Sequence, residues 1–312
     1  MGQRKHAMAN TAKLAIDSTV LKSSQINFYI GAYSYKLQAE KGVEYYSVTN
    51  GTQSFSAPVL WAFGSDTRGQ SYIFQHNDTY YEARISFFVG LGFNITPDHP
   101  DKPSESLELA LGRALPQDEQ IKCFGCHTVA SSTTDEHFAP AHAMLGVSCE
   151  GCHGAGAAHV ALAKAGEGGA EPGLIFNPAR LTPAQSVDFC GACHRTWWDV
   201  NQQSGIRTVR FPAFRLEESK CWGTGDARLT CVACHNPHQP LVRDAAAYDA
   251  KCLSCHQSKP SGHSAQGPQA PACRVSTKNC VSCHMGRYKI PAFRVAFTDH
   301  KIQILRGKNF QE

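Results

Sequence analysis

One short pattern, C-x-x-C-H, recurs six times in this chain of 312 residues and constrains its fold more than any other feature. The six copies, numbered here motifs 1 to 6, are Cys123/Cys126/His127, Cys149/Cys152/His153, Cys190/Cys193/His194, Cys231/Cys234/His235, Cys252/Cys255/His256 and Cys280/Cys283/His284. Histidine is about one residue in twenty. Six C-x-x-C pairs each followed by histidine would therefore arise by chance with a probability on the order of 10⁻⁸.

The spacing within each motif suits covalent attachment of a c-type haem. Two thiols three positions apart on a helical turn share one face, so both can reach the vinyl groups on one edge of a porphyrin. The histidine, four positions after the first cysteine, lies on the same face and brings its imidazole under the iron. The sequence thus predicts six haem c groups, each held by the two cysteines and the histidine of its motif.

The second axial ligand of each iron is expected from the nine histidines outside the motifs. His159 follows motif 2 through glycines, which let the backbone approach a flat ring. His238 lies three residues past motif 4 and is held by Pro237, so it points to a neighbouring haem rather than to its own. His300 follows motif 6 among apolar residues. By the same logic, 149–159 is better interpreted as a joint between two haems than as one pocket.

The other candidate ligands are His142, His99, in a turn stiffened by prolines, and His6. His76, at a strand end, is expected to be structural, and His137 and His263 are reserves. Met144 and Met285 are weaker candidates, because abundant imidazole favours ligation by two histidines, which gives lower potentials than His/Met.

Two cysteines, Cys221 and Cys273, lie outside the motifs. A disulfide between them is slightly favoured over two inert thiols, since c-type haem is attached in oxidising compartments. Two rival interpretations of the motifs are weaker. Three Cys₄ zinc sites would leave the constant histidine unexplained, and a thioredoxin-like C-x-x-C needs a βαβ setting that the pattern does not predict.

The region before motif 1 has no cysteine and predicts an antiparallel meander. Runs at 26–37, 43–48, 58–64, 71–75 and 79–89 are rich in aromatic and β-branched residues, and Asn-Gly or Gly-Ser-Asp turn signals separate them. About five strands are expected. The module either buries an apolar face for packing or offers a docking surface. Residues 1–25 are expected to be partly helical, with Ala9, Ala12, Ile16 and Val20 on one stripe, and 104–115 helical.

The fold class expected for the whole chain is α+β. A proline-rich linker at 96–103 marks a boundary, so we predict a β-rich module over 1–116 and a multihaem domain over 117–312. In that domain short helices carry the motifs, stacked porphyrins replace the side-chain core, and 154–173 and 258–271 are mainly loops.

Composition places the chain among globular proteins, with 18% charged and 42% hydrophobic residues. No run of 18 apolar residues predicts a transmembrane helix. The basic start lacks an apolar region, so no signal peptide is visible. Covalent haem attachment takes place outside the cytoplasm, which predicts a mature or trimmed periplasmic or extracellular protein. Haem propionates would add about 12 negative charges to the formal +4, so nucleic-acid binding is not expected.

Five segments resemble multihaem c-type cytochromes: E-G-C-H-G-A-G-A-A-H (150–159), C-G-A-C-H-R (190–195), C-V-A-C-H-N-P-H (231–238), C-V-S-C-H-M (280–285) and F-T-D-H-K-I (297–302). The chain looks like uncharacterised multihaem cytochromes of acidobacteria and related soil or hot-spring bacteria. It is more distantly similar to tetrahaem carriers of ammonia oxidisers. The resemblance covers 117–302 well and the β-rich start loosely. It implies closely stacked haems, mostly with two histidine ligands, and electron transfer.

Three functions are compatible with these patterns. An electron carrier has saturated irons and only outer-sphere transfer, with redox proteins as partners. A variant of it is an extracellular filament, in which His6 of one subunit binds a haem of the next. An enzyme reducing a nitrogen or sulfur oxyanion would need one open iron, with His137, Arg195 or Tyr288 as acid/base groups. Haem storage explains the close spacing least well.

Overall fold

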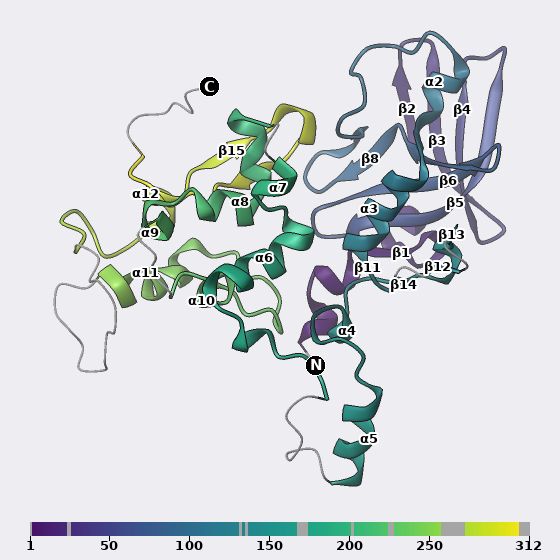
Figure 1. The fold of residues 1–312 in the computed structure, drawn as a ribbon. Coiled ribbons are helices and arrows are strands. Elements are labelled where there is room, and N and C mark those ends of the chain that lie inside the picture. The colour runs from purple at the N-terminus through teal and green to yellow at the C-terminus, as the bar shows by residue number, and fades with distance from the viewer. Residues whose placement is uncertain are drawn as a thin grey trace. The chain divides into compact units, whose positions relative to one another are not determined.

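The computed structural model describes residues 2–23, 26–130, 133–134, 137–166, 174–200, 203–223, 228–256 and 272–305. The chain forms two compact units (Figure 1). The first compact unit comprises Met1–Ile175 and Pro291–Arg294, and the second comprises Phe176–Ile290 and Val295–Glu312. Motifs 1 and 2 therefore lie in the first, and motifs 3 to 6 in the second. The boundary predicted between residues 116 and 117 separates the region without cysteines from the region of the motifs, and it stays a prediction.

The predicted α+β class is confirmed: an antiparallel sheet fills the first compact unit and short helices dominate the second (Figure 1). Among the described residues ten strands join the sheet: β1 (Ala12–Leu14), β2 (Ile26–Ile30), β3 (Tyr33–Glu40), β4 (Val43–Thr49), β5 (Ser54–Ser65), β6 (Gly69–His76), β7 (Thr79–Ala83), β8 (Ile85–Phe88), β9 (Gly92–Ile95) and β10 (Gly112–Leu115). The main path is β10-β7-β6-β5-β4-β3-β2, with β1 paired to β5, and β8 joining β6 to β9.

The meander is antiparallel as predicted, but it has more strands than expected, because two runs are interrupted and because β1, β9 and β10 lie outside the predicted runs. A turn at Gly31, with φ of +60°, divides 26–37 into β2 and β3. In 79–89 the break falls at buried Arg84. Its guanidinium donates to the carbonyl oxygens of Pro100 (2.9 Å), Lys102 (2.6 Å) and Leu109 (3.3 Å). The linker thus folds back onto the sheet to satisfy a buried charge.

Alternating side chains of the sheet build a dense aromatic core. Tyr35, Tyr46 and Phe74 are fully buried, and the rings of Tyr46 and Phe74 lie 5.1 Å apart. The Tyr46 hydroxyl donates to the Leu111 carbonyl oxygen at 2.8 Å and accepts the Arg84 amide at 3.3 Å. The predicted packing role of this module is therefore visible in its side chains.

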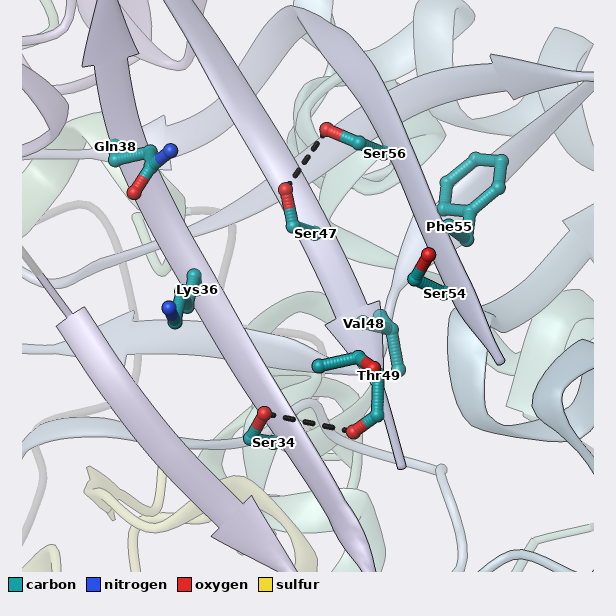
Figure 2. Close-up of a pocket in the computed structure, with 9 residues that line it drawn as sticks. All are labelled: Ser34, Lys36, Gln38, Ser47, Val48, Thr49, Ser54, Phe55 and Ser56. Atoms are coloured by element: carbon teal, nitrogen blue, oxygen red, sulfur yellow. Dashed lines mark hydrogen bonds between the residues drawn. The ribbon is translucent and has the colours of Figure 1, made fainter. Parts of the chain in front are cut away.

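The opposite face of β3, β4 and β5 is polar. Figure 2 shows its side chains around a shallow hollow of about 270 Å³, lined by Ser34, Lys36, Gln38, Ser47, Val48, Thr49, Ser54, Phe55 and Ser56. The Ser47 and Ser56 hydroxyls are hydrogen-bonded across the strands at 2.8 Å, and the Ser34 hydroxyl donates to the Thr49 carbonyl oxygen at 3.4 Å. Lys36 is the one charged residue of this lining. The docking alternative for this module stays a prediction.

The N-terminal segment is only partly helical. It contains the 3-10 turns η1 (Gln3–Lys5), η2 (Met8–Asn10) and η3 (Ala15–Asp17) and the short helix α1 (Thr19–Ser23). The single stripe predicted over residues 9–20 is wrong, because Ala12 belongs to β1 and pairs with Phe63 of β5. Pairing with an existing sheet satisfies its backbone better than an isolated helix could.

The predicted helix at 104–115 is shorter than expected. Helix α2 (Leu107–Leu111) is capped by the Ser106 hydroxyl, and the chain then enters β10 at Gly112. A side chain at Gly112 would come within 2.0 Å of the Glu82 carbonyl oxygen on β7. Glycine therefore allows β10 to approach the sheet where the pattern alone predicted helix.

The haem-motif region consists of short helices and turns. They are α3 (Gln117–His127), α4 (Cys149–His153), α5 (Ala157–Ala165), α6 (Pro183–His194), α7 (Trp197–Val200), α8 (Pro212–Glu217), α9 (Lys220–Gly223), α10 (Cys231–Cys234), α11 (Asp249–His256) and α12 (Cys280–His284), with 3-10 turns η4 (Pro140–His142), η5 (Pro178–Arg180), η6 (Gly205–Arg210), η7 (Ala245–Tyr248) and η8 (Pro291–Phe293). Two-stranded ladders are β11 (Thr128–Ala130) with β14 (Met144–Leu145), β12 (Thr133–Thr134) with β13 (His137–Phe138), and β15 (Arg287–Lys289) with β16 (Ala296–Thr298).

The loop prediction for 154–173 is wrong in part, because α5 occupies Ala157–Ala165. Five alanines in that stretch give strong helix propensity after Gly156. The loop predicted for 258–271 lies outside the described residues.

Candidate haem centres

All six motifs lie on helical turns. Motifs 2 and 6 occupy the short helices α4 and α12, and motifs 1, 3 and 5 end the longer helices α3, α6 and α11. In motif 4 only the two cysteines lie in a helix, α10, because His235 has extended backbone. The two thiols of each motif are therefore one helical turn apart, which is the geometry that attachment to one porphyrin edge requires.

The cysteines of the motifs differ in how far their side chains are covered. The second cysteine is half-buried in four motifs and exposed in motifs 3 and 6; in order along the chain these residues are Cys126, Cys152, Cys193, Cys234, Cys255 and Cys283. The first cysteine is half-buried in all motifs but motif 2; in order these residues are Cys123, Cys149, Cys190, Cys231, Cys252 and Cys280. None of the twelve is in a disulfide, so each sulfur can form a thioether bond. Their attachment to haem stays a prediction.

Motif 1 is anchored on the sheet. Phe124, between its cysteines, is buried against Trp61 and Phe63 of β5, with ring centres 5.2 and 5.0 Å away. Nδ1–H of His127 donates to the Thr11 carbonyl oxygen at 2.9 Å, and burial lowers the pKa of His127. A neutral imidazole with its proton held on Nδ1 has its Nε2 lone pair available for a metal.

Motif 2 is tied to motif 1 through the N-terminal segment. The Gly146 amide donates to the His127 carbonyl oxygen at 2.9 Å, and the Val147 amide donates to that of Met8 at 2.9 Å. The Gln3 amide side chain donates to the Val147 carbonyl oxygen at 2.6 Å. Residues 3–12 therefore hold both motifs of the first compact unit.

Motifs 3 to 6 are consecutive neighbours in space. The thiols of Cys190 in motif 3 and Cys231 in motif 4 are hydrogen-bonded, which lowers the pKa of Cys190 to about 7. The thiols of Cys252 in motif 5 and Cys280 in motif 6 are also hydrogen-bonded. Motif 4 meets motif 5 through Cys234, whose pKa is raised first by burial and then by Cys252. The first cysteines thus meet within the pairs 3/4 and 5/6.

The second cysteine of motif 5 has a contact of a different kind. The Ser254 hydroxyl lies 3.9 Å from the sulfur of Cys255, and the same hydroxyl donates to the Lys251 carbonyl oxygen at 2.7 Å. All three residues belong to α11. The contact therefore lies within one helix, unlike the thiol contacts that join neighbouring motifs.

The Asp249 carboxylate fixes motifs 5 and 6 to each other. Asp249 begins α11, which carries motif 5, and accepts the backbone amides of Asn279 and Cys280 at 2.8 Å each. Those amides open α12, which carries motif 6, and they lower the pKa of Asp249. One carboxylate therefore caps the helix of the neighbouring motif.

The rings of His235 of motif 4 and His300 lie close together, with ring centres 6.2 Å apart and planes 48° apart. An imidazole nitrogen binds a first-row transition metal at about 2 Å, so imidazoles on opposite sides of one iron have ring centres about 6 Å apart. Nδ1–H of His300 donates to the Thr298 carbonyl oxygen at 3.1 Å. Burial, followed by the charges of His235 and His194, lowers the pKa of His300 to about 4, so the ring is neutral at pH 7.

A cavity of about 410 Å³ adjoins motif 4. It is lined by Val232, Cys234, His235, Asn236, Pro237, Val242, Ala247, Tyr248 and Lys251. The lining supplies one thiol and the imidazole of motif 4, an apolar wall and one cation. These groups fit a haem: thiol and imidazole for attachment, apolar side chains for the ring, and lysine for a propionate.

Motif 6 has a similarly oriented imidazole. Nδ1–H of His284 donates to the Gln303 carbonyl oxygen at 3.0 Å, and the Gln303 amide donates to the His284 carbonyl oxygen at 3.1 Å. The C-terminal segment thus orients the imidazole of His284 in motif 6, and it also carries His300, which lies close to motif 4.

The predicted ligand His99 lies close to motif 1 but is engaged elsewhere. Its side chain is buried, and Nε2 lies 3.3 Å from the Glu82 carboxylate, which also pairs with Arg113 at 3.0 Å. The pKa of Glu82, which burial alone would raise, is lowered by these partners, and the Glu82 charge acts on Cys123 of motif 1. Its role as a ligand stays a prediction.

His6 differs from the histidines above. The Met8 amide donates to its Nδ1 at 3.1 Å, so the neutral ring carries its proton on Nε2. Binding a metal through Nε2 would require this local hydrogen bond to be replaced.

The remaining predicted ligands are dispersed. His142 is exposed on η4, His159 is half-buried on α5, and His238 is exposed in a turn where its amide donates to Asn236 at 2.9 Å. Their ligand roles, and those of His153, His194 and His256, stay predictions. His76 contacts Glu108 at 3.2 Å on the sheet, as expected of a structural residue. The side chain of His137 and the whole of His263 lie outside the described residues.

The predicted disulfide between Cys221 and Cys273 is wrong: the structure contains no bond between the two sulfurs, and Cys273 is exposed. The backbone amides of Ser276 and Val275 donate to the Cys273 thiol and lower its pKa. Its own turn therefore satisfies this sulfur.

Sequence reasoning missed Arg215 and Ser219, which hold the segment carrying His300. Burial of a charged residue is hard to predict from sequence. The one available signal for this support was Asp299, which directly precedes the predicted ligand His300.

Comparison with protein families finds one match: residues 99–154 match the family described as cytochrome c554 and c-prime. The matched segment contains motifs 1 and 2 together with His99 and His142. It supports a c-type cytochrome, with covalently bound haem c and electron transfer as the general function. No curated protein and no solved structure matches the chain.

The described part of the chain contains no group of three or more His, Cys, Asp or Glu side chains placed to hold a metal ion by themselves. Within the same ranges, none of the helices combines the length and hydrophobicity of a membrane span.

Proposed function

We propose that this protein carries electrons through six covalently bound haem c groups, most of them ligated by two histidines. The observation that carries the proposal is the spacing of His235 and His300, whose ring centres are separated as on opposite sides of one iron. Haem c supplies a reversible one-electron couple, and two imidazoles leave no position on the iron for a substrate.

The chain's own residues supply attachment, orientation and order. Thr11, Thr298 and Gln303 accept the Nδ1 protons of His127, His300 and His284. In each of these three rings a proton on Nδ1 leaves the Nε2 lone pair available, so little reorganisation is needed to bind iron. The consecutive contacts of motifs 3 to 6 support four closely spaced haems in the second compact unit, and motifs 1 and 2 support two in the first.

The test counts haems and examines their ligation. We expect the intact mass of the mature protein to exceed that of the chain by six haem masses. Electron paramagnetic resonance should be dominated by low-spin ferric signals, and reduced protein should not bind carbon monoxide. Fewer than six haems would contradict the proposed number. A high-spin signal with carbon monoxide binding in the unmodified protein would contradict saturated ligation and favour the oxyanion reductase.

We further propose a periplasmic or extracellular location, since haem c is attached outside the cytoplasm, and redox proteins as partners. In a filament, His6 would replace the Met8 hydrogen bond with a haem of the next subunit. Electron microscopy of His6→Ala compared with the unmodified protein tests this. Filaments that persist in the variant, or monodisperse unmodified protein at high concentration, would contradict that role.

A further inference from the structure

A buried ion pair lies beside His300 in the second compact unit. Arg215 of α8 donates through Nε to Oδ1 of Asp299 at 2.8 Å and through Nη2 to Oδ2 at 2.7 Å. Asp299 is fully buried and Arg215 nearly so. Asp299 and His300 are consecutive, so this bidentate pair fixes the backbone from which the His300 ring projects.

The same segment is held at two more points. The Ser219 hydroxyl donates to the His300 carbonyl oxygen at 3.3 Å and accepts the Ile302 amide at 2.9 Å. Gln303 exchanges two hydrogen bonds with His284 of motif 6. Five residues, 299–303, therefore connect the ring facing motif 4 to the proximal histidine of motif 6.

A second set of bonds closes the turn around Asp299. Its amide donates to the Gly286 carbonyl oxygen at 2.7 Å, and its carboxylate accepts the Lys301 amide at 2.9 Å. With the Arg215 guanidinium, the Asp299 carboxylate thus has a partner for each oxygen. Burying a charged pair is costly, and a hydrophobic pair would pack at similar stability. A positional role accounts for charges at this site.

We propose that Arg215 is a positioning residue: through Asp299 it holds His300 opposite His235, and through the same segment it orients His284 of motif 6. The inference rests on the proposed function, in which His300 is the distal ligand of the haem at motif 4. A displaced imidazole leaves the iron open to an external ligand, and loss of a supporting group outside the ligand sphere weakens metal ligation about 10–100-fold.

The decisive experiment uses the haem-loaded protein carrying Arg215→Met. One haem of the six should become high-spin and bind carbon monoxide, which the unmodified protein should not do. The potential of a second haem should shift, because His284 loses its fixed acceptor. Lys301→Met is the matched control: it removes a cation next to His300 that pairs with Glu218 at 3.7 Å, keeps both Arg215–Asp299 hydrogen bonds, and should leave both signals unchanged.

Two further variants keep the inference testable if Arg215→Met does not fold. Ser219→Ala removes two anchoring hydrogen bonds from the segment at small volume change and should give a weaker form of the same spectral change. Arg215→Lys keeps the charge but loses the bidentate geometry, and should fall between Arg215→Met and the unmodified protein.

The outcomes separate this inference from the proposed function. Six low-spin haems without carbon monoxide binding in Ser219→Ala and in Arg215→Lys or Arg215→Met would overturn the positioning role. The same spectral change in Lys301→Met would assign the effect to charge instead and would also overturn it. Carbon monoxide binding in the unmodified protein would overturn the proposed ligation instead.

Discussion

The two compact units differ in what fills their interiors. In the first, the sheet buries a continuous cluster of side chains that includes the rings of Tyr35, Tyr46 and Phe74. In the described part of the second, the buried cluster consists of Val187, Ala213 and Leu216, with a few half-buried neighbours. Large apolar groups remain exposed there, among them Trp197, Trp198 and Val232.

This difference shows where the hydrophobic driving force must come from. A chain segment that buries so few apolar side chains cannot offset the conformational entropy lost on folding. Six porphyrins would supply that apolar surface, four of them in the second compact unit. The sheet, by contrast, has a core of its own.

Loss of haem should have the largest effect and should distinguish the two compact units most clearly. In a chain with all twelve motif cysteines changed to alanine, the second compact unit should lose nearly all its amide protection, whereas β2 to β7 should keep theirs. Hydrogen–deuterium exchange followed by mass spectrometry measures both at once. Protection in 183–217 equal to that of the sheet would show that the second unit has an adequate core without haem.

Removal of a buried cation should be the next largest effect, and the two units differ in what it leaves behind. Arg215→Met leaves the Asp299 carboxylate buried without its partner and should cost about 3–5 kcal/mol. Arg84→Met in the first unit leaves neutral carbonyls, and should cost about 1.5–3 kcal/mol. Denaturant titration of haem-loaded protein compares them. A larger loss of stability for Arg84→Met would contradict the expectation that an unpaired buried carboxylate costs more than unpaired carbonyl groups.

A buried hydroxyl tests whether the sheet is independent of haem. Tyr46→Phe removes the hydrogen bonds to Leu111 and Arg84 and should cost the first unit about 1–3 kcal/mol. The loss should be the same with and without haem. Tyr45→Phe, on a half-buried neighbouring position, is the control and should change stability little. A haem-dependent cost for Tyr46→Phe would mean that the core of the sheet depends on haem.

Alkaline pH should cause the smallest loss of stability, and this loss should be confined to the sheet. Burial raises the pKa of Tyr35 to about 12, above the usual value of 10, so the native state retains a proton that the unfolded chain releases. This contribution to stability is intact below pH 10 and is lost as the pH rises through 12. Circular dichroism at stepped pH should show a shallower loss for Tyr35→Phe. Burial also raises the pKa values of Tyr46 and Tyr72, so these two residues account for the loss of stability that remains in the variant.

The sequence predicted the motifs, their helical turns and the antiparallel meander well, since each depends on local spacing. Strand limits were less predictable. The break at Arg84 depends on three carbonyl groups of a linker more than fifteen residues away, and β1 depends on pairing with β5. The proposed ligands His300 and His235 were both found from sequence, but their proximity was not, because 65 positions separate the two histidines.

The amino-acid sequence by itself predicts six haem attachment sites, because attachment needs only two thiols and an imidazole at this spacing. It also determined the α+β class, through the change from alternating strands to cysteine motifs. Tertiary structure alone decided which motifs are neighbours, which histidine faces which, and that Arg215 supports the segment carrying His300. These are long-range relations, fixed by packing and by the need to satisfy buried charges, and no local spacing encodes them.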